Sequence, residues 1–244
     1  MGYWGVVNNC LKNADIILLI VDARIPQEST NKEIIRIAGQ LEKRILLVFN
    51  KIDLVDFSKL KRDYPGSIFV SAEKNKGIKE LRTELERISE IYPASMRVAI
   101  LGYPNVGKSS ILNKIVPQSR EKVSRVSGTT KKTKWIRYKN LRFMDSPGVI
   151  PRRDSKVAVG LTASKNIHKI KNPEKVAIEV IKVLRRNSRK KLEEHFKITF
   201  DEEEDNYDIL LKIGEKRKYL IKGGEIDENK TAIKIVEEWQ KGKI

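Results

Sequence analysis

The sequence predicts an α/β fold built on a parallel sheet, followed by a smaller region that is mostly α-helical. Short apolar runs rich in β-branched residues alternate with segments of helical spacing over residues 14–115, and a glycine-rich loop lies between one such run and the next helix. From residue 173 onward the pattern is helical. A chain of 244 residues with 40% hydrophobic content can bury one large core, or a medium and a small one.

The first part of the chain alternates predicted helices and strands. A short amphipathic helix over residues 4–13 precedes a buried strand over 14–21, and a helix over 30–39 leads to a second strand over 44–49. A third strand over 67–70 is followed by a helix over 77–91 whose apolar residues form one stripe. The stripe residues, which we expect in the core, are Ile78, Leu81, Leu85 and Ile88. Such alternation indicates parallel strands joined by helical crossovers.

The stretch GYPNVGKS at residues 102–109 fits the phosphate-binding pattern G-x-x-x-x-G-K-[ST], with a predicted strand before it and a helix over 109–115 after it. Gly102 and Gly107 allow the backbone N–H groups to point at a polyphosphate, and the helix dipole adds positive potential. We expect Lys108 to reach the β- and γ-phosphates and the Ser109 hydroxyl to coordinate a magnesium ion. The predicted phosphate contacts in this loop are Asn105, Val106, Gly107, Lys108, Ser109 and Ser110.

The second strand ends in NKID at residues 50–53, the position where ligands bind in open α/β sheets. The carboxylate of Asp53 can accept two charge-assisted hydrogen bonds from guanine N1–H and N2–H₂, whereas adenine has a lone pair at N1. Two such bonds, at roughly 1.5–3 kcal/mol each, give a preference for guanine on the order of 10²–10⁴. We expect Asn50 and Lys51 to brace the loop and stack on the base, and backbone N–H groups at Ser71 and Ala72 to meet guanine O6.

Beyond the phosphate loop, SGTT at residues 127–130 precedes a strand pair around 134–138 and 141–144, which ends in DSPG at 145–148. We expect a threonine hydroxyl to complete the magnesium shell and Asp145 to hold the ion through a water. The Gly148 N–H is predicted to contact the γ-phosphate. Loss of that phosphate would release both loops, as in other nucleotide switches.

Together these motifs resemble those of the circularly permuted GTPases of the YlqF/YawG type, a ribosome-assembly family. In ordinary GTPases the P-loop comes first and N-K-x-D and S-A come last, whereas here NKID and SAE precede the P-loop. Residues 14–24 resemble the strand that normally follows D-x-x-G, and residues 22–26 match the family's D-A-R-x-P. The resemblance covers about residues 14–150. It implies a three-layer P-loop GTPase sheet with permuted motif order, GTP/GDP and Mg²⁺ as ligands, and hydrolysis of GTP to GDP and phosphate that is slow without an activator.

The same resemblance assigns some residues and leaves others open. Thr130 aligns with the family's switch threonine, with Thr129 as the alternative, so the expected magnesium ligands are Ser109, Thr130 and Asp145. Val149 follows the D-x-x-G glycine, where many signalling GTPases have a water-orienting glutamine. Some family members carry an N-terminal histidine, but the histidines here are at positions 168 and 195. The catalytic residue therefore stays unknown.

Asn105 has two open interpretations. It matches a P-loop asparagine that helps to coordinate a potassium ion in related GTPases, and it is equally suited to a plain turn. Potassium is therefore a candidate cofactor beside magnesium.

The charge of the chain points to an anionic macromolecule as partner. The net charge is +18, with +12 on residues 1–150 and +6 on the remainder. Nine basic residues against one glutamate lie within residues 117–142, a segment that also contains Trp135 and Tyr138. Charge of this size and clustering is typical of nucleic-acid binding. With the family resemblance, it predicts ribosomal RNA or a precursor of the large ribosomal subunit as the partner.

The C-terminal region differs in character. Residues 1–150 are predicted to form the GTPase domain, residues 151–172 a basic connector, and residues 173–244 a helical domain that resembles the family's RNA-binding one. Helices are expected from 173, over 207–216 and over 230–240, with an acidic turn at 201–205 and a break at Gly223-Gly224. Six of the ten residues from 182 to 191 are basic. The expected core positions are Val176, Val180, Val183, Leu184, Ala232, Ile235, Val236 and Trp239.

Three further expectations concern the cellular setting. The longest apolar run is far shorter than the ~20 residues of a membrane span, and no leader pattern is present, so we expect no membrane association. The single cysteine, Cys10, excludes an internal disulfide and suits the cytoplasm; we expect it to be a buried apolar residue. We expect a monomer.

Two functions of different classes follow. The first is a magnesium-dependent GTPase switch whose nucleotide states differ in affinity for ribosomal RNA or a large-subunit precursor. The alternative is an RNA-binding assembly factor that holds GTP structurally with negligible turnover. A GTPase that acts only on a protein target is a third option, which does not explain the charge.

Overall fold

A computed structural model describes residues 3–92, 94–116, 135–145, 160–162, 170 and 172–244. The chain divides into two compact units, the first formed by residues 1–53 and 57–152 and the second by residues 54–56 and 153–244. Most of the predicted connector at 151–172 lies outside the described residues. The three predicted segments, with their limits, therefore stay a prediction.

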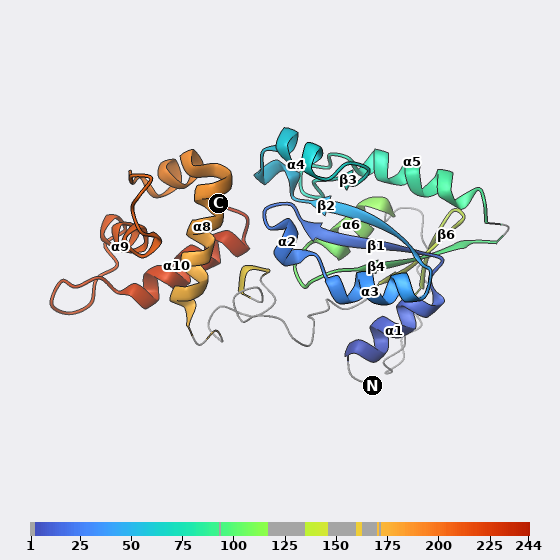
Figure 1. The fold of residues 1–244 in the computed structure, drawn as a ribbon, viewed down its shortest axis with the longest axis horizontal. Helices are drawn as coiled ribbons and strands as arrows, with labels where there is room; N and C mark the ends of the chain where they lie inside the picture. Colours follow the sequence, from blue (N-terminus) through green and yellow to red (C-terminus); the bar gives the residue numbers. More distant parts are fainter. Residues whose placement is uncertain (1–2, 93, 117–134, 146–159, 163–169, 171) are drawn as a thin grey trace. The chain divides into compact units, whose positions relative to one another are not determined.

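In the part of the first unit that the structure describes, six strands form one sheet in the order β3-β2-β1-β4-β6-β5 (Figure 1). The strands are β1 (Ile16–Asp22), β2 (Arg44–Asn50), β3 (Ile68–Phe69), β4 (Met96–Leu101), β5 (Trp135–Tyr138) and β6 (Leu141–Asp145). All neighbours are parallel except β5, which runs antiparallel to β6. Strand β4, which leads into the P-loop, is central although three strands precede it in the chain. The predicted permuted order is thereby confirmed.

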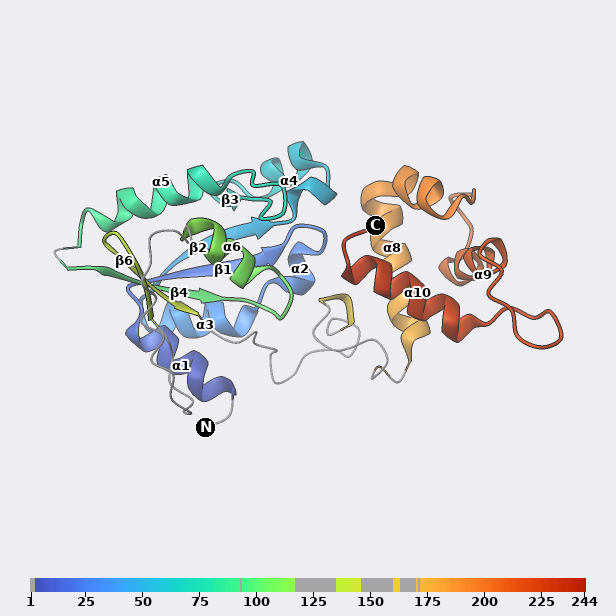
Figure 2. The same ribbon diagram turned by 180° about the vertical axis from the view of Figure 1, so that it is seen from behind.

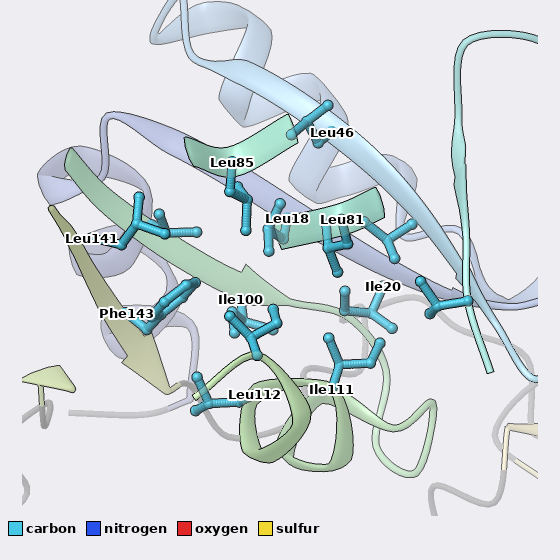
Figure 3. Packing of buried hydrophobic residues seen from close by; sticks show 14 of the residues in the cluster. Leu18, Ile20, Leu46, Leu81, Leu85, Ile100, Ile111, Leu112, Leu141 and Phe143 are labelled. Carbon is cyan, nitrogen blue, oxygen red and sulfur yellow. The ribbon is translucent and has the colours of Figure 1, made fainter. Parts of the chain in front are cut away.

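One face of the sheet packs against α5 (Ile78–Ser89) and α6 (Lys108–Ile115). Figure 3 shows alternate residues of the central strands and of β6 pointing into this layer, where they meet leucines and isoleucines of the two helices. The predicted stripe of α5 is confirmed, because all four of its residues belong to this cluster. The residues labelled in the figure are Leu18, Ile20, Leu46, Leu81, Leu85, Ile100, Ile111, Leu112, Leu141 and Phe143.

The opposite face is covered by α1 (Tyr3–Asn13) and α3 (Lys32–Gln40), which lie below the sheet in Figure 1, while the short α2 (Pro26–Ser29) lies at the end of β1. Val7, Leu11 and Ile34 are fully buried there. Cys10 is also fully buried, and burial raises the pKa of its thiol to about 11, so it acts as a small apolar core residue, as predicted. Helices on both faces give the predicted three-layer arrangement.

The structure differs from the sequence prediction at β3 and in several short helical segments. Strand β3 has only two paired residues, because the chain turns away after Val70 into a loop closed by the bridge between Ser71 and Lys76. A 3₁₀ turn over Ile52–Leu54 and the helices α2 and α4 (Phe57–Asp63) were not predicted. Helix α4 buries only Leu60, so the sequence offers no apolar stripe that would reveal it.

In the described part of the second unit, α8 (Pro173–Phe196), α9 (Asn206–Lys216) and α10 (Glu228–Gln240) pack on one another (Figure 2). The predicted core positions in α8 and α10 are all buried. Asp205 and Asp227 cap the later two helices by accepting from the N–H groups of Tyr207 and Lys230. Helix α8 is interrupted at Ser188, whose φ of −161° and ψ of 52° are not helical.

Among the residues that the structure describes, no helix could span a membrane. Although α8 has 24 residues, neither it nor any other described helix combines the length and the apolar character needed to cross a bilayer.

Candidate nucleotide-binding site

The P-loop between β4 and α6 requires both of its glycines. Their φ angles are +147° at Gly102 and +100° at Gly107, positive values that residues with a Cβ rarely adopt. A Cβ at Gly102 would lie 2.4 Å from the backbone oxygen of Ile20, and a Cβ at Gly107 would lie 2.1 Å from Nδ2 of Asn50. The loop is therefore held against the ends of β1 and β2 as well as sharply curved.

Lys108 lies inside this curve. Its side chain is buried, and Nζ donates to the backbone oxygen of Tyr103 at 2.6 Å. The neighbouring Ser109 and Ser110, at the N-terminus of α6, are exposed, as is Asn105, whose φ is 59°. The loop is thus only partly on the surface.

Asn50 joins the P-loop to the loop after β3. The side chain is buried, its Nδ2 donates to the backbone oxygen of Val106 at 2.8 Å, and its Oδ1 accepts from the N–H of Ala72 at 3.0 Å. Positions 50, 72 and 106 belong to three separate predicted motifs. One amide side chain therefore assembles the NKID, SAE and P-loop segments at the C-terminal edge of the sheet.

The side chain of Asp22 lies at the centre of a buried cluster of charges that the sequence analysis did not identify. Its carboxylate accepts from Nζ of Lys51 at 2.7 Å, from Nη2 of Arg24 at 3.0 Å and from Nε of Arg24 at 3.1 Å. Asp22 and Arg24 are almost fully buried, whereas the side chain of Lys51 is 23% exposed. Residues 22–24 belong to the D-A-R-x-P match, which was the available sequence signal.

Electrostatics in this cluster favour the charged carboxylate. Burial alone would raise the pKa of Asp22, but the adjacent positive charges of Arg24 and Lys51 outweigh it and lower the pKa well below its usual range. Burial also lowers the pKa of Lys51, and the charge of Asp22 opposes that shift. Lys51 has a φ of 67°, so its backbone turns sharply at the end of β2 while its ammonium is fixed on Asp22. The ammonium therefore does not extend freely into solvent.

Asp53 lies in the 3₁₀ turn after Lys51 and is partly buried. It also lines a cavity of about 660 Å³ beside α4, β3 and the start of α5, which no P-loop residue lines. The N–H of Ser71 donates to the backbone oxygen of Lys76 at 2.9 Å, and that of Ala72 donates to Asn50. Both amides thus have acceptors within the protein. Contacts of Asp53, Ser71 and Ala72 with guanine stay predictions.

The remaining site residues are described only in part. Asp145 is the last residue of β6 and pairs with Ile100 of β4, so the strand that delivers it ends beside the strand that leads into the P-loop. The side chain of Asp145, together with Thr130, Gly148 and Val149, lies outside the described residues. Their predicted roles at magnesium and the γ-phosphate stay predictions.

The basic run of the second unit is partly used within that unit. Arg185 donates from Nη1 to the backbone oxygen of Glu204 at 2.7 Å and to Oδ1 of Asn206 at 2.8 Å. Arg189 donates to the backbone oxygen of Phe200, and its guanidinium lies 4.8 Å from the centre of that ring. These two arginines hold the acidic turn against α8, whereas the side chain of Lys190 is 89% exposed.

Sequence comparisons match this chain to two families. The profile described as RsgA GTPase matches residues 6–151, and the profile described as 50S ribosome-binding GTPase matches residues 97–213. An uncharacterised GTP-binding protein of Methanocaldococcus jannaschii is 35% identical over 245 residues, covering 98% of this chain and 65% of that protein. The chain thus spans slightly less than two thirds of the length of this relative.

Two further comparisons concern more distant proteins. The ribosome biogenesis GTPase A of Bacillus cereus is 28% identical over 259 residues, covering 98% of this chain and 86% of that protein. The GDP-bound structure of YlqF from Thermotoga maritima gives a TM-score of 0.64 at 20% identity, covering 98% of this chain and 95% of the other. The chain therefore has the fold of YlqF.

Proposed function

Because the chain belongs to the RsgA GTPase family, we propose that it binds GTP at the C-terminal edge of its sheet and hydrolyses it to GDP and phosphate. The resemblance to circularly permuted GTPases, inferred from the order of the motifs, is confirmed by this membership and by the YlqF fold. The observation that carries the proposal is the side chain of Asn50, which joins the NKID loop to the P-loop and to Ala72. It brings the predicted base and phosphate sites together.

The phosphates are proposed to bind at the start of α6. Backbone N–H groups over residues 105–110 and the positive end of the helix dipole favour an anion there. Lys108 would exchange its bond with the Tyr103 oxygen for the β- and γ-phosphates, and its burial strengthens that interaction. Both interpretations of the exposed Asn105 stand: it helps to coordinate a potassium ion, or it only forms a turn.

The residues present fit a magnesium ion. Ser109 is exposed at the N-terminus of α6, and the pairing of β4 with β6 places the end of the strand carrying Asp145 at the same edge. A hydroxyl and a carboxylate beside phosphate oxygens are the ligands that this cation prefers. Thr130 is the proposed third protein contact, and the ion would neutralise charge on the phosphates. The group that activates the attacking water is unknown, since Val149 has no polar side chain.

The guanine base is proposed to lie between Asp53 and the loop at Ser71 and Ala72. Lys51 would contribute the methylene part of its side chain, because its ammonium is held by Asp22. Asp53 would accept from guanine N1–H and N2–H₂. When the nucleotide binds, the N–H of Ala72 would change its acceptor from Oδ1 of Asn50 to guanine O6.

Ribosome assembly is the proposed cellular role. The Bacillus relative is named a ribosome biogenesis GTPase, and a family profile described as 50S ribosome-binding matches part of this chain. The net charge of +18 supports a polyanionic partner. We propose that a monomer in the cytoplasm binds ribosomal RNA or a large-subunit precursor, and that the helical region at 173–244 contributes to that binding.

The test is steady-state GTP hydrolysis with and without purified large ribosomal subunits at fixed salt and magnesium. We expect the rate to rise with added subunits, and subunit affinity to differ by about 5–150-fold between a non-hydrolysable GTP analogue and GDP, a typical allosteric coupling. Gly148→Ala should abolish that difference. Equal affinities and negligible turnover would instead favour the alternative of an RNA-binding factor with structural GTP.

A further inference from the structure

The β5–β6 hairpin presents a basic and aromatic surface on the side of the sheet away from the α5–α6 layer. Successive residues of a strand point to opposite faces. On one face, residues of the hairpin pack on the core cluster, namely Ile136, Tyr138, Leu141 and Phe143, of which the last two are visible in Figure 3. The intervening residues Trp135, Arg137, Arg142 and Met144 therefore lie on the other face, where Met144 is buried. Trp135 is 42% exposed and both arginines are exposed.

Three arginines form a row across neighbouring strands on this face. Arg137 of β5 is directly opposite Arg142 of β6, and Arg142 is in register with Arg97 of β4. Arg97 is neutralised by Asp15, with Nη2 and Oδ1 2.7 Å apart. Among the described residues, neither Arg137 nor Arg142 has an acidic partner within ion-pair distance.

This arrangement is unfavourable for the isolated protein. Like charges directly opposite each other on adjacent strands destabilise a sheet, and an exposed indole beside them leaves apolar surface in water. A polyanion with stackable rings would relieve both costs.

We propose that Trp135, Arg137 and Arg142, here called the hairpin surface, bind single-stranded RNA, with phosphates on the two arginines and one base stacked on the indole. Proteins that bind single strands combine positive charge with exposed aromatic rings, and sheet faces carry such rings in known RNA-binding modules. Acidic protein segments could satisfy the arginines but would leave the indole without a planar partner. The proposal rests on the proposed function, because it names the RNA contact of the GTPase unit.

The hairpin surface is separate from the nucleotide site. Arg97 is five residues before Gly102, where the P-loop begins, so the arginine row and the P-loop are roughly 17 Å apart along the strand at ~3.3 Å per residue. Trp135 is paired with Met144, which is paired with Ala99, so it is in register with a position roughly 10 Å before Gly102. Substitutions on the hairpin surface should therefore change RNA binding while GTP affinity stays the same.

The experiment measures fluorescence anisotropy of a labelled single-stranded 16-nucleotide RNA with the full chain over a range of salt concentrations. Trp135→Ala should lower affinity about 5–150-fold, the range expected for one stacked base, whereas Trp135→Phe should retain most of it. Arg137→Gln with Arg142→Gln should reduce the slope of log K against log salt by about 1.4. The matched control is Arg36→Gln with Arg62→Gln, which removes two exposed charges from α3 and α4 and should leave affinity nearly unchanged.

The outcomes separate this inference from the proposed function. GTP affinity and the melting temperature of each variant establish that it is folded, and the affinity of the unsubstituted chain for large ribosomal subunits is measured in parallel. If the unsubstituted chain binds RNA or subunits but the hairpin variants bind the oligonucleotide as well as the control does, the hairpin surface is not an RNA site and the proposed function stands. If the unsubstituted chain binds neither, the inference and the proposed ribosomal role both fail, whereas the proposed GTP binding and hydrolysis are tested separately by nucleotide titration and turnover. Equal loss of affinity for polyglutamate and RNA in Trp135→Ala would also overturn the inference.

Discussion

Basic residues form hydrogen bonds within the protein both at the C-terminal edge of the sheet and in the basic run of α8. Their acceptors differ between the two regions. At the sheet edge, Arg24 and Lys51 share the buried carboxylate of Asp22, next to the residues that assemble the proposed nucleotide site. In α8, Arg185 and Arg189 donate to backbone oxygens of the turn that follows the helix. The first set lies beside the proposed nucleotide site, and the second set stabilises a local fold.

This contrast shows why a run of basic residues does not by itself identify a binding surface. Residues 182–191 have the denser positive charge in sequence, yet two of their arginines have partners within the helical unit. The hairpin arginines 137 and 142 have no acidic partner in the part of the chain that the structure describes. RNA binding by residues 173–244 stays a prediction that rests on the exposed members of the run.

The largest expected effect is at the P-loop. Lys108→Ala removes an ammonium proposed to donate to two phosphates, which at roughly 1.5–3 kcal/mol each should lower GTP affinity on the order of 10²–10⁴-fold. Isothermal titration with GTP measures the loss, and circular dichroism checks the fold. Lys114→Ala, the same change at an exposed position of α6, is the control and should bind GTP normally. GTP hydrolysis that survives in Lys108→Ala would contradict the P-loop assignment.

The next effect concerns the buried charge cluster. Asp22→Asn leaves Arg24 and Lys51 without their shared carboxylate and should lower the stability of the first unit by about 3–5 kcal/mol. Urea unfolding measures the change, and Asp63→Asn on the exposed end of α4 is the matched control. A loss no larger than that of the control would show that Asp22 does not compensate the two cations.

The same substitution has a pH signature. The folded-state pKa of Asp22 is lowered, so its stabilising contribution is complete above the ordinary aspartate pKa of 3.8 and is lost as the pH falls toward the folded-state value. The difference in unfolding free energy between the unsubstituted protein and Asp22→Asn should therefore be constant at neutral pH and shrink below about pH 4. A difference that grows on acidification would contradict the direction of the shift.

The smallest expected effect is a change in stability that separates two members of the basic run at residues 182–191. Arg185→Gln leaves the oxygens of Glu202 and Glu204 without their donor and should cost the second unit about 1–3 kcal/mol of stability. Lys190→Gln, at an 89% exposed side chain, should change stability by less than about 0.5 kcal/mol. Thermal unfolding compares the two. Equal stability losses would mean that Arg185 does not hold the turn.

Sequence patterns predicted those features of the fold and site that depend on neighbouring residues. The buried strands β1, β2 and β4 contain continuous apolar runs, helix α5 has a periodic apolar stripe, and NKID and the P-loop are continuous motifs. Helix α4 was missed because a single leucine is buried. The need for both P-loop glycines could be predicted because the loop must curve sharply. The close approach of Asn50 to Gly107 depends instead on how the strands pack, which the motif does not specify.

Contacts between distant segments could not be predicted in this way. Lys51 binds a carboxylate 29 positions earlier, and Asn50 donates to an oxygen 56 positions later. Arg97, Arg142 and Arg137 align only because of the strand register, which the sequence pattern does not specify. The sequence therefore located most of the proposed ligand contacts, whereas the structure identified the residues that hold them in place.

The most direct test of the guanine site is nucleotide specificity at Asp53. Titrations with GTP, ATP and xanthosine triphosphate compare the unsubstituted protein with Asp53→Asn, and Asp56→Asn serves as the neighbouring control. We expect the unsubstituted protein to prefer GTP over ATP on the order of 10²–10⁴-fold, because two charge-assisted hydrogen bonds are at stake. Asp53→Asn should lose GTP affinity and gain affinity for xanthosine triphosphate, whose O2 accepts from the new amide. Unchanged GTP affinity in Asp53→Asn would contradict the proposed guanine site.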